Sequence, residues 1–228
     1  TNSARQATSQ TDENLTSENV RVVEHTLGKA LVPINPQRIL VLTGGLDTVL
    51  ALGIMPVGSV QGQQVNYLKS RLEGISSVGS PASPNLESIA DLNPDLILGT
   101  KLYNENNYKL LSQIAPTVLA EVDTTSDWQK MLNKYAEALG KTDRAKQIIA
   151  DYDARIESFQ SQMGDRLQQT EVSILRVRQD RVEIYLEDSF PGTVVMDAGL
   201  PRPPSQTNTE QTFDIEIGKE SLHLADGD

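Results

Sequence analysis

The chain has 228 residues, of which 38% are hydrophobic and 22% are charged, so it is long enough and apolar enough to bury one or two globular cores. Its formal net charge of -11 disfavours binding to nucleic acid or to an anionic membrane surface, because neither attracts an acidic protein at long range. The lack of cysteine excludes disulfides, thiolate metal ligands and cysteine nucleophiles. No apolar run approaches the ~18 residues that a membrane-spanning helix requires.

The first 20 residues are rich in Thr, Ser, Asn, Gln and acidic side chains and have no hydrophobic periodicity. This composition predicts a flexible tether over residues 1–20. The segment contains no initiating Met and no apolar signal core, as expected of an exported protein whose signal peptide has been removed. A lipoprotein with its anchoring cysteine just before Thr1 would look like this, and so would a chain cut at an arbitrary point.

Residues 21–140 alternate between short apolar runs and short helical patterns. Each run is bounded by Gly or Pro, which is typical of buried strands. Continuous apolar strands separated by helices predict a parallel sheet covered on both faces, and hence a first α/β lobe. The four expected strands are 38–42, 56–60, 95–99 and 116–120.

Two stronger helical patterns follow the predicted sheet. Apolar residues at helical spacing fill 127–139, and a second stripe runs from Thr142 to Met163 and ends at Gly164. At 1.5 Å per residue the second helix spans roughly 30 Å, about the width of a small domain. We therefore expect residues 141–164 to form a helix that connects two lobes.

Residues 165–228 are expected to form the second lobe. Residues 171–178 and 181–186 read as two strands joined by a tight turn, and 213–217 alternate like a further strand. The intervening loop, 201–212, is dense in Pro, Ser, Thr and Asn.

One phrase of sequence occurs twice. Residues 87–95 and 220–228 share Glu, Ser, an aliphatic residue and a final Asp in register, and the upstream stretches 48–56 and 193–201 also correspond. Two similar lobes would follow, and the cleft between paired lobes suits a small molecule. The first copy runs directly into an expected strand, whereas the sequence ends with the second copy. The predicted fold is therefore α/β, with two Rossmann-like lobes of mainly parallel sheet, a long connecting helix and an incomplete second lobe. A longer native chain or self-association would complete it.

Six short blocks occur in order along the chain: VEHTLG at 23–28, PINPQRILVL at 33–42, ALGIMPVG at 51–58, PNLESI at 84–89, LNPDLI at 92–97 and IAPT at 114–117. Together they resemble the iron-siderophore substrate-binding proteins of ABC importers. The resemblance covers nearly everything from Val20 onward, and the ordered combination is specific although each block alone is weak.

The resemblance implies two α/β lobes joined by a rigid helix, with the ligand held in a shallow cleft. It implies a ferric siderophore as ligand, an ABC permease dimer as membrane partner, and a periplasmic or cell-surface lipoprotein. Iron would be bound only through the siderophore, with no protein metal site and no cofactor. Family members continue beyond the end of this sequence, which is a departure from the pattern.

Arg176 and Arg178 are the leading candidates for ligand contact. They lie two residues apart near the carboxyl end of the strand that opens the second lobe, so both point to one side. Guanidinium groups offer planar, bidentate donors to carboxylate or catecholate oxygens. Arg176 also matches the binding arginine of the family that the chain resembles. The alternative is a pair of surface salt bridges to Glu183 or Glu187.

Further ligand candidates lie in or beside loops that are expected to reach the cleft: Tyr185, Arg202, Lys101 and Tyr103. For each of them an ordinary solvated or half-buried position is an equal alternative. Thr43 and Gly44 follow the first strand and provide backbone N–H groups near a helix start, which suits an anion. A tight strand-to-helix turn also explains the glycine, and the spacing is not that of a dinucleotide fingerprint.

Glu87 and Glu220 are the glutamates of the repeated phrase. The resemblance implies that each docks on arginines of the permease, one from each lobe. The alternative is an acid placed at a helix N-terminus, where the macrodipole favours it by ~0.3 to 1 kcal/mol.

Other functions have less support. His25 and His223 are the only histidines and are far apart, so they indicate no metal site, and Trp128 falls on an apolar stripe and is expected to pack in a core. No nucleophile elbow, P-loop or zinc-protease motif occurs, so we expect no enzyme. Cobalamin or haem binding, and a non-transporting sensor or scaffold, remain alternatives; a hydrolase is a more distant one.

Overall fold

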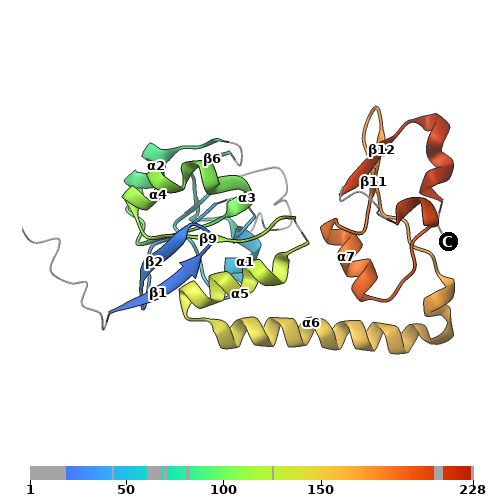
Figure 1. Cartoon of the computed structure of the whole chain (residues 1–228), viewed down its shortest axis with the longest axis horizontal. Coiled ribbons are helices and arrows are strands. Elements are labelled where there is room, and N and C mark those ends of the chain that lie inside the picture. The colour runs from blue at the N-terminus through green and yellow to red at the C-terminus, as the bar shows by residue number, and fades with distance from the viewer. Residues whose placement is uncertain are drawn as a thin grey trace, which may run out of the picture. The chain divides into compact units, whose positions relative to one another are not determined.

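The computed structural model describes residues 19–42, 44–60, 68, 71–80, 83–124, 126–207 and 213–226. The chain divides into two compact units (Figure 1). Unit 1 contains the residues up to Ala120 together with 137–141, and unit 2 contains 121–136 and everything from Thr142. Thr43 and residues 1–18 of the predicted tether lie outside the described residues.

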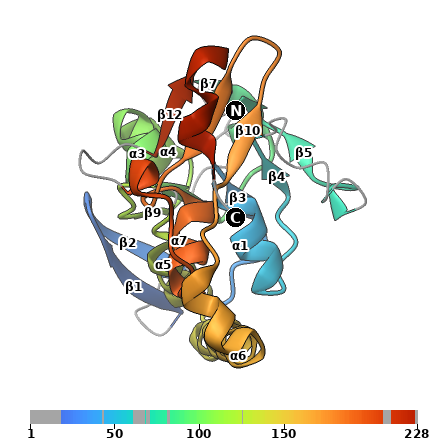
Figure 2. The ribbon, with the colours of Figure 1, turned by 90° about the vertical axis from the view of Figure 1, so that its right-hand side faces the viewer.

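Unit 1 is built on a five-stranded parallel sheet with the order β5-β4-β3-β8-β9, of which β5-β4-β3 can be followed in Figure 2. Each of the four apolar runs predicted from the sequence contains one strand, which confirms the parallel sheet. The strands are β3 (Ile39–Val41), β4 (Gly58–Ser59), β5 (Ser76–Ser77), β8 (Leu96–Thr100) and β9 (Thr117–Ala120).

Helices of unit 1 pack apolar side chains against this sheet. Leu40 and Ile97 of the sheet pack with Ile89 and Leu111 from two of these helices. All four side chains are fully buried, so this cluster forms the main core of unit 1. The helices are α1 (Leu46–Ala51), α2 (Leu86–Asp91), α3 (Lys101–Asn104), η2 (Glu105–Asn107) and α4 (Tyr108–Ile114).

Two hairpins complete unit 1. Strands β1 (Val20–His25) and β2 (Gly28–Pro33) pair antiparallel, and Val23 and Val32 are buried while Val22 and Leu31 are exposed. This alternation is the period-2 pattern of a ribbon with one buried face. The second hairpin joins β6 (Gly79–Ser80) to β7 (Ser83–Pro84).

The two long helices have nearly the predicted bounds. They are α5 (Trp128–Leu139) and α6 (Thr142–Met163), and η3 (Gly164–Gln169) follows. Gly140 and Gly164 have φ of 65° and 54°, so each provides the left-handed residue that ends a helix. In the part of the chain that the structure describes, no helix combines the length and apolar character needed to cross a bilayer.

Unit 2 contains a three-stranded sheet with the order β10-β11-β12. All of its pairings are antiparallel, whereas mainly parallel strands were expected for both lobes. For β10 and β11 this is the hairpin that the sequence predicted, because the turn at Gln179-Asp180 is too short for the crossover that parallel strands need. The elements are β10 (Leu175–Val177), β11 (Val182–Tyr185), α7 (Phe190–Asp197), η4 (Pro204–Gln206), β12 (Asp214–Ile217) and η5 (Lys219–Ala225).

The internal correspondence seen in the sequence is visible in the ends of α1 and α7. Gly53 and Gly199 have φ of 82° and 75°, and each directly follows the last turn of its helix. The next residue donates its N–H back into that turn, from Ile54 to Val49 at 2.9 Å and from Leu200 to Val195 at 3.2 Å. The later phrase diverges: α2 is an α-helix, whereas the second copy is the 3₁₀ helix η5, and Asp228 lies outside the described residues.

Candidate ligand-binding surface

The sheet of unit 2 has one apolar and one polar face. Ile184, Leu186 and Ile217 form a core cluster on the apolar side. On the other side Arg176 lies opposite Glu183, and Glu183 lies opposite Glu216 on the next strand. Because side chains alternate along a strand, the residues two positions away share this polar face. They include Arg178, Arg181 and Tyr185.

Glu183 lies at the centre of the polar face. Its Oε1 lies 2.7 Å from Nε of Arg178 and 3.5 Å from Nε of Arg181, and its Oε2 lies 3.7 Å from Nε of Arg176. The Glu183 side chain is only 5% exposed, whereas the three guanidinium side chains are 37–49% exposed. The carboxylate is therefore covered by arginines that themselves remain accessible.

These contacts shift the pKa values of Glu183 and Arg178. The hydrogen bond from Arg178, helped by the charges of Arg178, Arg176 and Arg181, holds the pKa of Glu183 below its usual value and outweighs the opposing effect of desolvation. The same hydrogen bond raises the pKa of Arg178. Glu183 is therefore ionised at neutral pH, and the polar face carries its negative charge.

Three of the residues predicted to contact a ligand are brought together here. Nη1 of Arg176 donates to the Tyr185 hydroxyl at 3.2 Å, and Arg178 lies beside both through Glu183. The alternative named from the sequence, ion pairs with Glu183, is also present for both arginines. A contact with an internal carboxylate leaves other guanidinium N–H groups to bind a ligand, since each guanidinium carries five N–H donors.

Arg202 differs from these arginines because it is buried, with 6% of its surface exposed. Its Nη2 donates to the carbonyl of Tyr185 and, at 2.9 Å, to Oε1 of Gln206. Burial lowers the pKa of Arg202, with a partial offset from the charge of Glu187. Among the described residues, Nε and Nη1 of Arg202 have no hydrogen-bond partner. Arg202 thus lies beside Tyr185, the last residue of β11, whose side chain belongs to the polar face that carries Arg176, Arg178 and Arg181, called the arginine face below.

The remaining ligand candidates belong to unit 1. Gly44 follows β3, and Lys101 and Tyr103 lie in α3, which starts directly after β8. Strands β3 and β8 are parallel neighbours, so all three residues lie at the carboxyl edge of the sheet, where open α/β sheets bind ligands. Gly44 and Tyr103 are exposed and Lys101 is half-buried.

The two glutamates of the repeated phrase are both exposed. Glu87 lies in the first turn of α2. Asn85 caps this helix, and its side chain accepts a hydrogen bond from the N–H of Ser88 at 2.9 Å. Glu220 lies in the first turn of η5, with its carboxylate against Gly218. Each unit therefore presents one glutamate at the start of a helical segment, where a helix macrodipole also favours an acid.

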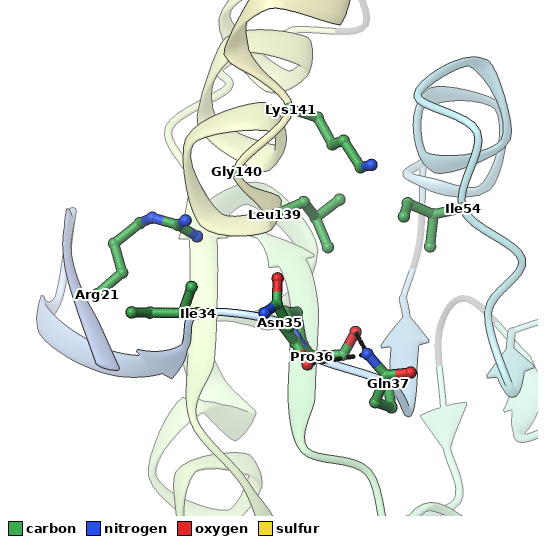
Figure 3. Close-up of a pocket in the computed structure, with 9 residues that line it drawn as sticks. All are labelled: Arg21, Ile34, Asn35, Pro36, Gln37, Ile54, Leu139, Gly140 and Lys141. Carbon is green, nitrogen blue, oxygen red and sulfur yellow. Dashed lines mark hydrogen bonds between the residues drawn. The ribbon is translucent and has the colours of Figure 1, made fainter. Parts of the chain in front are cut away.

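A pocket of about 260 Å³ lies at the opposite edge of the unit 1 sheet (Figure 3). Residues 34–37 in its wall precede β3, and Ile54 precedes β4, so the pocket lies near the amino ends of these strands. Nη1 of Arg21 donates to the carbonyl of Ala138 at 2.9 Å, which satisfies a carbonyl in the last turn of α5. Arg21 therefore complements a helix C-terminus here.

The two histidines belong to different units. Nδ1 of His25 accepts the N–H of Leu27 at 3.3 Å, and its Nε2 lies 3.2 Å from the hydroxyl of Tyr108. His223 lies in η5 of the other unit. Among the described residues no group of three or more His, Cys, Asp or Glu side chains is arranged to hold a metal ion.

Trp128 lies half-buried at the start of α5. Its ring meets that of Tyr152 edge to face, with centroids 5.1 Å apart, and the Tyr152 hydroxyl donates to Oδ2 of Asp197 at 2.6 Å. These contacts link α5, α6 and α7 within unit 2, so the tryptophan has a packing role there.

Comparison with known proteins agrees with this arrangement. The sequence model of the family described as "Periplasmic binding protein" matches residues 39–228. The chain belongs to this family. It is 38% identical to the probable siderophore-binding lipoprotein YfiY of Bacillus subtilis, over 96% of this chain and 70% of that protein. It is 35% identical to the achromobactin-binding periplasmic protein of Dickeya dadantii, over 72% of this chain and 56% of that protein. These relatives are named as binding proteins.

A solved structure extends the comparison to the fold. Staphylococcus aureus SirA, crystallised in complex with staphyloferrin B, matches with a TM-score of 0.77 and 29% identity. The match covers 91% of this chain and 74% of that protein. The α/β architecture with a parallel sheet and a long helix is therefore that of a known binding protein.

Sequence reasoning did not identify Glu183 as the centre of the arginine face or Gln206 as the buried partner of Arg202. Glu183 was considered only as a possible salt-bridge partner, although its position between Val182 and Ile184 in an apolar strand marks it as facing the arginines of β10. Gln206 is fully buried and bonds Arg202, Ser173 and Leu224. Its loop position carries no comparable signal.

Proposed function

We propose that the chain is an extracytoplasmic solute-binding protein that captures a ferric siderophore and delivers it to an ABC permease. The two relatives described above are named as siderophore-binding and achromobactin-binding proteins, and the SirA structure contains staphyloferrin B. The observation that carries the proposal is the accessible arginine face of unit 2. Arg176, Arg178 and Tyr185 offer guanidinium and hydroxyl donors there to the oxygen atoms of an anionic chelate.

The ligand is proposed to contact both units. In unit 2 the contacts come from Arg176, Arg178, Tyr185 and Arg202. In unit 1 they come from the carboxyl edge of the sheet, through Lys101, Tyr103 and the Thr43-Gly44 turn. Iron is proposed to be bound through the siderophore alone, with no resident cofactor and no catalysis. The two lobes are proposed to be joined by residues 141–164.

Delivery is proposed to use the two exposed glutamates. Glu87 and Glu220 occupy corresponding positions in the repeated phrase, one on each unit. The two subunits of a permease dimer could therefore each bind one of them. The proposed location is the periplasm or the cell surface, held by a lipid anchor upstream of Thr1, and the naming of a relative as a lipoprotein supports it.

Tryptophan fluorescence tests the ligand class. The complete protein is titrated with ferric complexes of catecholate, hydroxamate and citrate-type siderophores, and with haem and cobalamin. We expect a saturable change with an anionic ferric siderophore and none with cobalamin, because only the former presents several negative oxygen atoms to the arginines. Saturation by haem or cobalamin alone would contradict the proposal.

A further inference from the structure

Glu183 contacts the arginine face through one particular edge of each guanidinium. Its carboxylate lies 2.7 Å from Nε of Arg178, 3.5 Å from Nε of Arg181 and 3.7 Å from Nε of Arg176. A guanidinium is planar, so a partner at Nε fixes the orientation of the whole fork. The terminal N–H groups then point away from the carboxylate.

Those terminal groups are available for other partners. Nη1 of Arg176 reaches the Tyr185 hydroxyl at 3.2 Å, and among the described residues the Nη atoms of Arg178 form no hydrogen bond. The side chains of Arg176 and Arg178 keep 49% and 39% of their surface exposed. Glu183 thus holds Arg178 by a hydrogen bond and Arg176 by a longer ion pair, without covering their outer donors.

The third arginine has acidic partners of its own. Nε of Arg181 lies 3.0 Å from Glu216, and its Nη1 lies 3.4 Å from Asp180, in addition to its 3.5 Å contact with Glu183. Arg181 therefore shares its charge among three carboxylates, whereas the ion pairs of Arg176 and Arg178 within the described residues are with Glu183. Glu183 cancels part of the positive charge that Arg176 and Arg178 present.

We propose that Glu183 is a positioning and specificity-determining residue for the ligand of this face. It orients Arg176 and Arg178, and its charge limits how strongly the face prefers a highly charged iron chelate to an uncharged one. This inference rests on the proposed function. It identifies net negative charge as the property by which the site discriminates between ligands.

Orientation and charge have opposite effects on binding and can be separated. Losing the orientation weakens every ligand that uses the arginines. Losing the negative charge of Glu183 strengthens attraction for an anion in proportion to the charge of that anion. The ratio of the affinities for two ligands of different charge cancels the shared loss and reports the charge effect alone.

The test uses the substitution Glu183→Gln, which keeps the size of the side chain. Calorimetry on the full chain measures Kd for a trianionic ferric tris-catecholate and for an uncharged ferric trihydroxamate. We expect the affinity ratio to shift toward the tris-catecholate by about fivefold, the upper range for one partly exposed charge pair. The tris-catecholate affinity should also become more dependent on salt.

Glu216→Gln is the matched control. It removes the same charge from the same sheet face, but Glu216 is 61% exposed and contacts Arg181 rather than the two ligand arginines. We expect its affinity ratio to stay within about twofold of that of the unmodified protein, because an exposed and more distant charge is screened by solvent and salt.

A second substitution keeps the proposal falsifiable if Glu183→Gln does not fold. Glu183→Asp keeps the charge but draws it back from the guanidinium edges, so both affinities should fall while their ratio holds. Equal affinity changes for both chelates in Glu183→Gln, or unchanged affinities in Glu183→Asp, would overturn the proposal. If the unmodified protein binds neither chelate, the proposed function fails, and this inference fails with it.

Discussion

The buried guanidinium of Arg202 donates a hydrogen bond to the side-chain oxygen of Gln206 at 2.9 Å. The side-chain nitrogen of Gln206 in turn donates to the hydroxyl of Ser173 and to the carbonyl of Leu224. The two side chains therefore tie the loop after α7 to the strand region before β10 and to η5. Because both are almost fully buried, this small network contributes to the stability of unit 2.

Replacing Gln206 by Leu should lower the free energy of unfolding by about 1 to 3 kcal/mol. The reason is that the substitution removes an acceptor from a buried guanidinium and leaves buried polar groups unpaired. Denaturant unfolding of the full chain measures the change. Gln179→Leu, at an exposed position of the hairpin turn, is the control and should shift stability by less than about 0.5 kcal/mol. Equal shifts in the two variants would contradict a structural network at Gln206.

Tyr152 should make the stability of unit 2 depend on alkaline pH. Burial, together with the hydrogen bond to Asp197, raises the pKa of its hydroxyl above the ordinary value of 10.0. A folded-state pKa above the unfolded one means that the stabilisation is complete below about pH 10 and is lost as the pH rises from there toward the folded-state pKa.

Tyr152→Phe removes the titrating group and tests this dependence. We expect the variant to lose roughly 1 kcal/mol at neutral pH, the scale of one hydrogen bond, and to show a shallower loss of stability above about pH 10. Thermal melts between neutral pH and about pH 11 measure both effects. Parallel melting curves for the variant and the unmodified protein across this range would rule out the assigned role.

Glu87 and Glu220 should matter for transport and not for ligand capture. Both are exposed and neither belongs to the arginine face of unit 2. Reversing both charges to Lys should abolish siderophore uptake by cells carrying the cognate permease, because arginines of the permease would then face like charges. Ligand affinity of the purified variant should stay unchanged. Reduced affinity, or normal uptake, would refute the docking role.

The sequence predicts elements well where one local pattern dominates. The apolar stripe of α6 and the glycine after it place its ends correctly at Thr142 and Met163. The strand expected over 56–60 is less accurate, since only Gly58–Ser59 pair in the sheet. A short apolar run shows that a strand exists, but its length depends on the neighbouring strands with which it pairs.

The candidate site is predictable in part for the same reason. The spacing of Arg176 and Arg178 placed them on one face, and a tight turn brings that face opposite Glu183. Arg202 is different, because its burial results from contacts with Tyr185 and Gln206 that a Pro-rich loop sequence does not reveal. The hairpin of β10 and β11 was predicted from its tight turn, whereas the antiparallel pairing of β12, which follows a long connection that contains α7, was not.

The most direct test of the central claim is calorimetric titration of the full chain and of Arg176→Ala with an anionic ferric siderophore. We predict saturable binding by the unmodified protein and a loss of about 1.5 to 3 kcal/mol of binding free energy in Arg176→Ala, the scale of a charge-assisted hydrogen bond. Arg155→Ala, at an exposed position on α6, should bind as the unmodified protein does. The absence of binding to every ferric siderophore tested, or equal affinity in Arg176→Ala, would contradict the account.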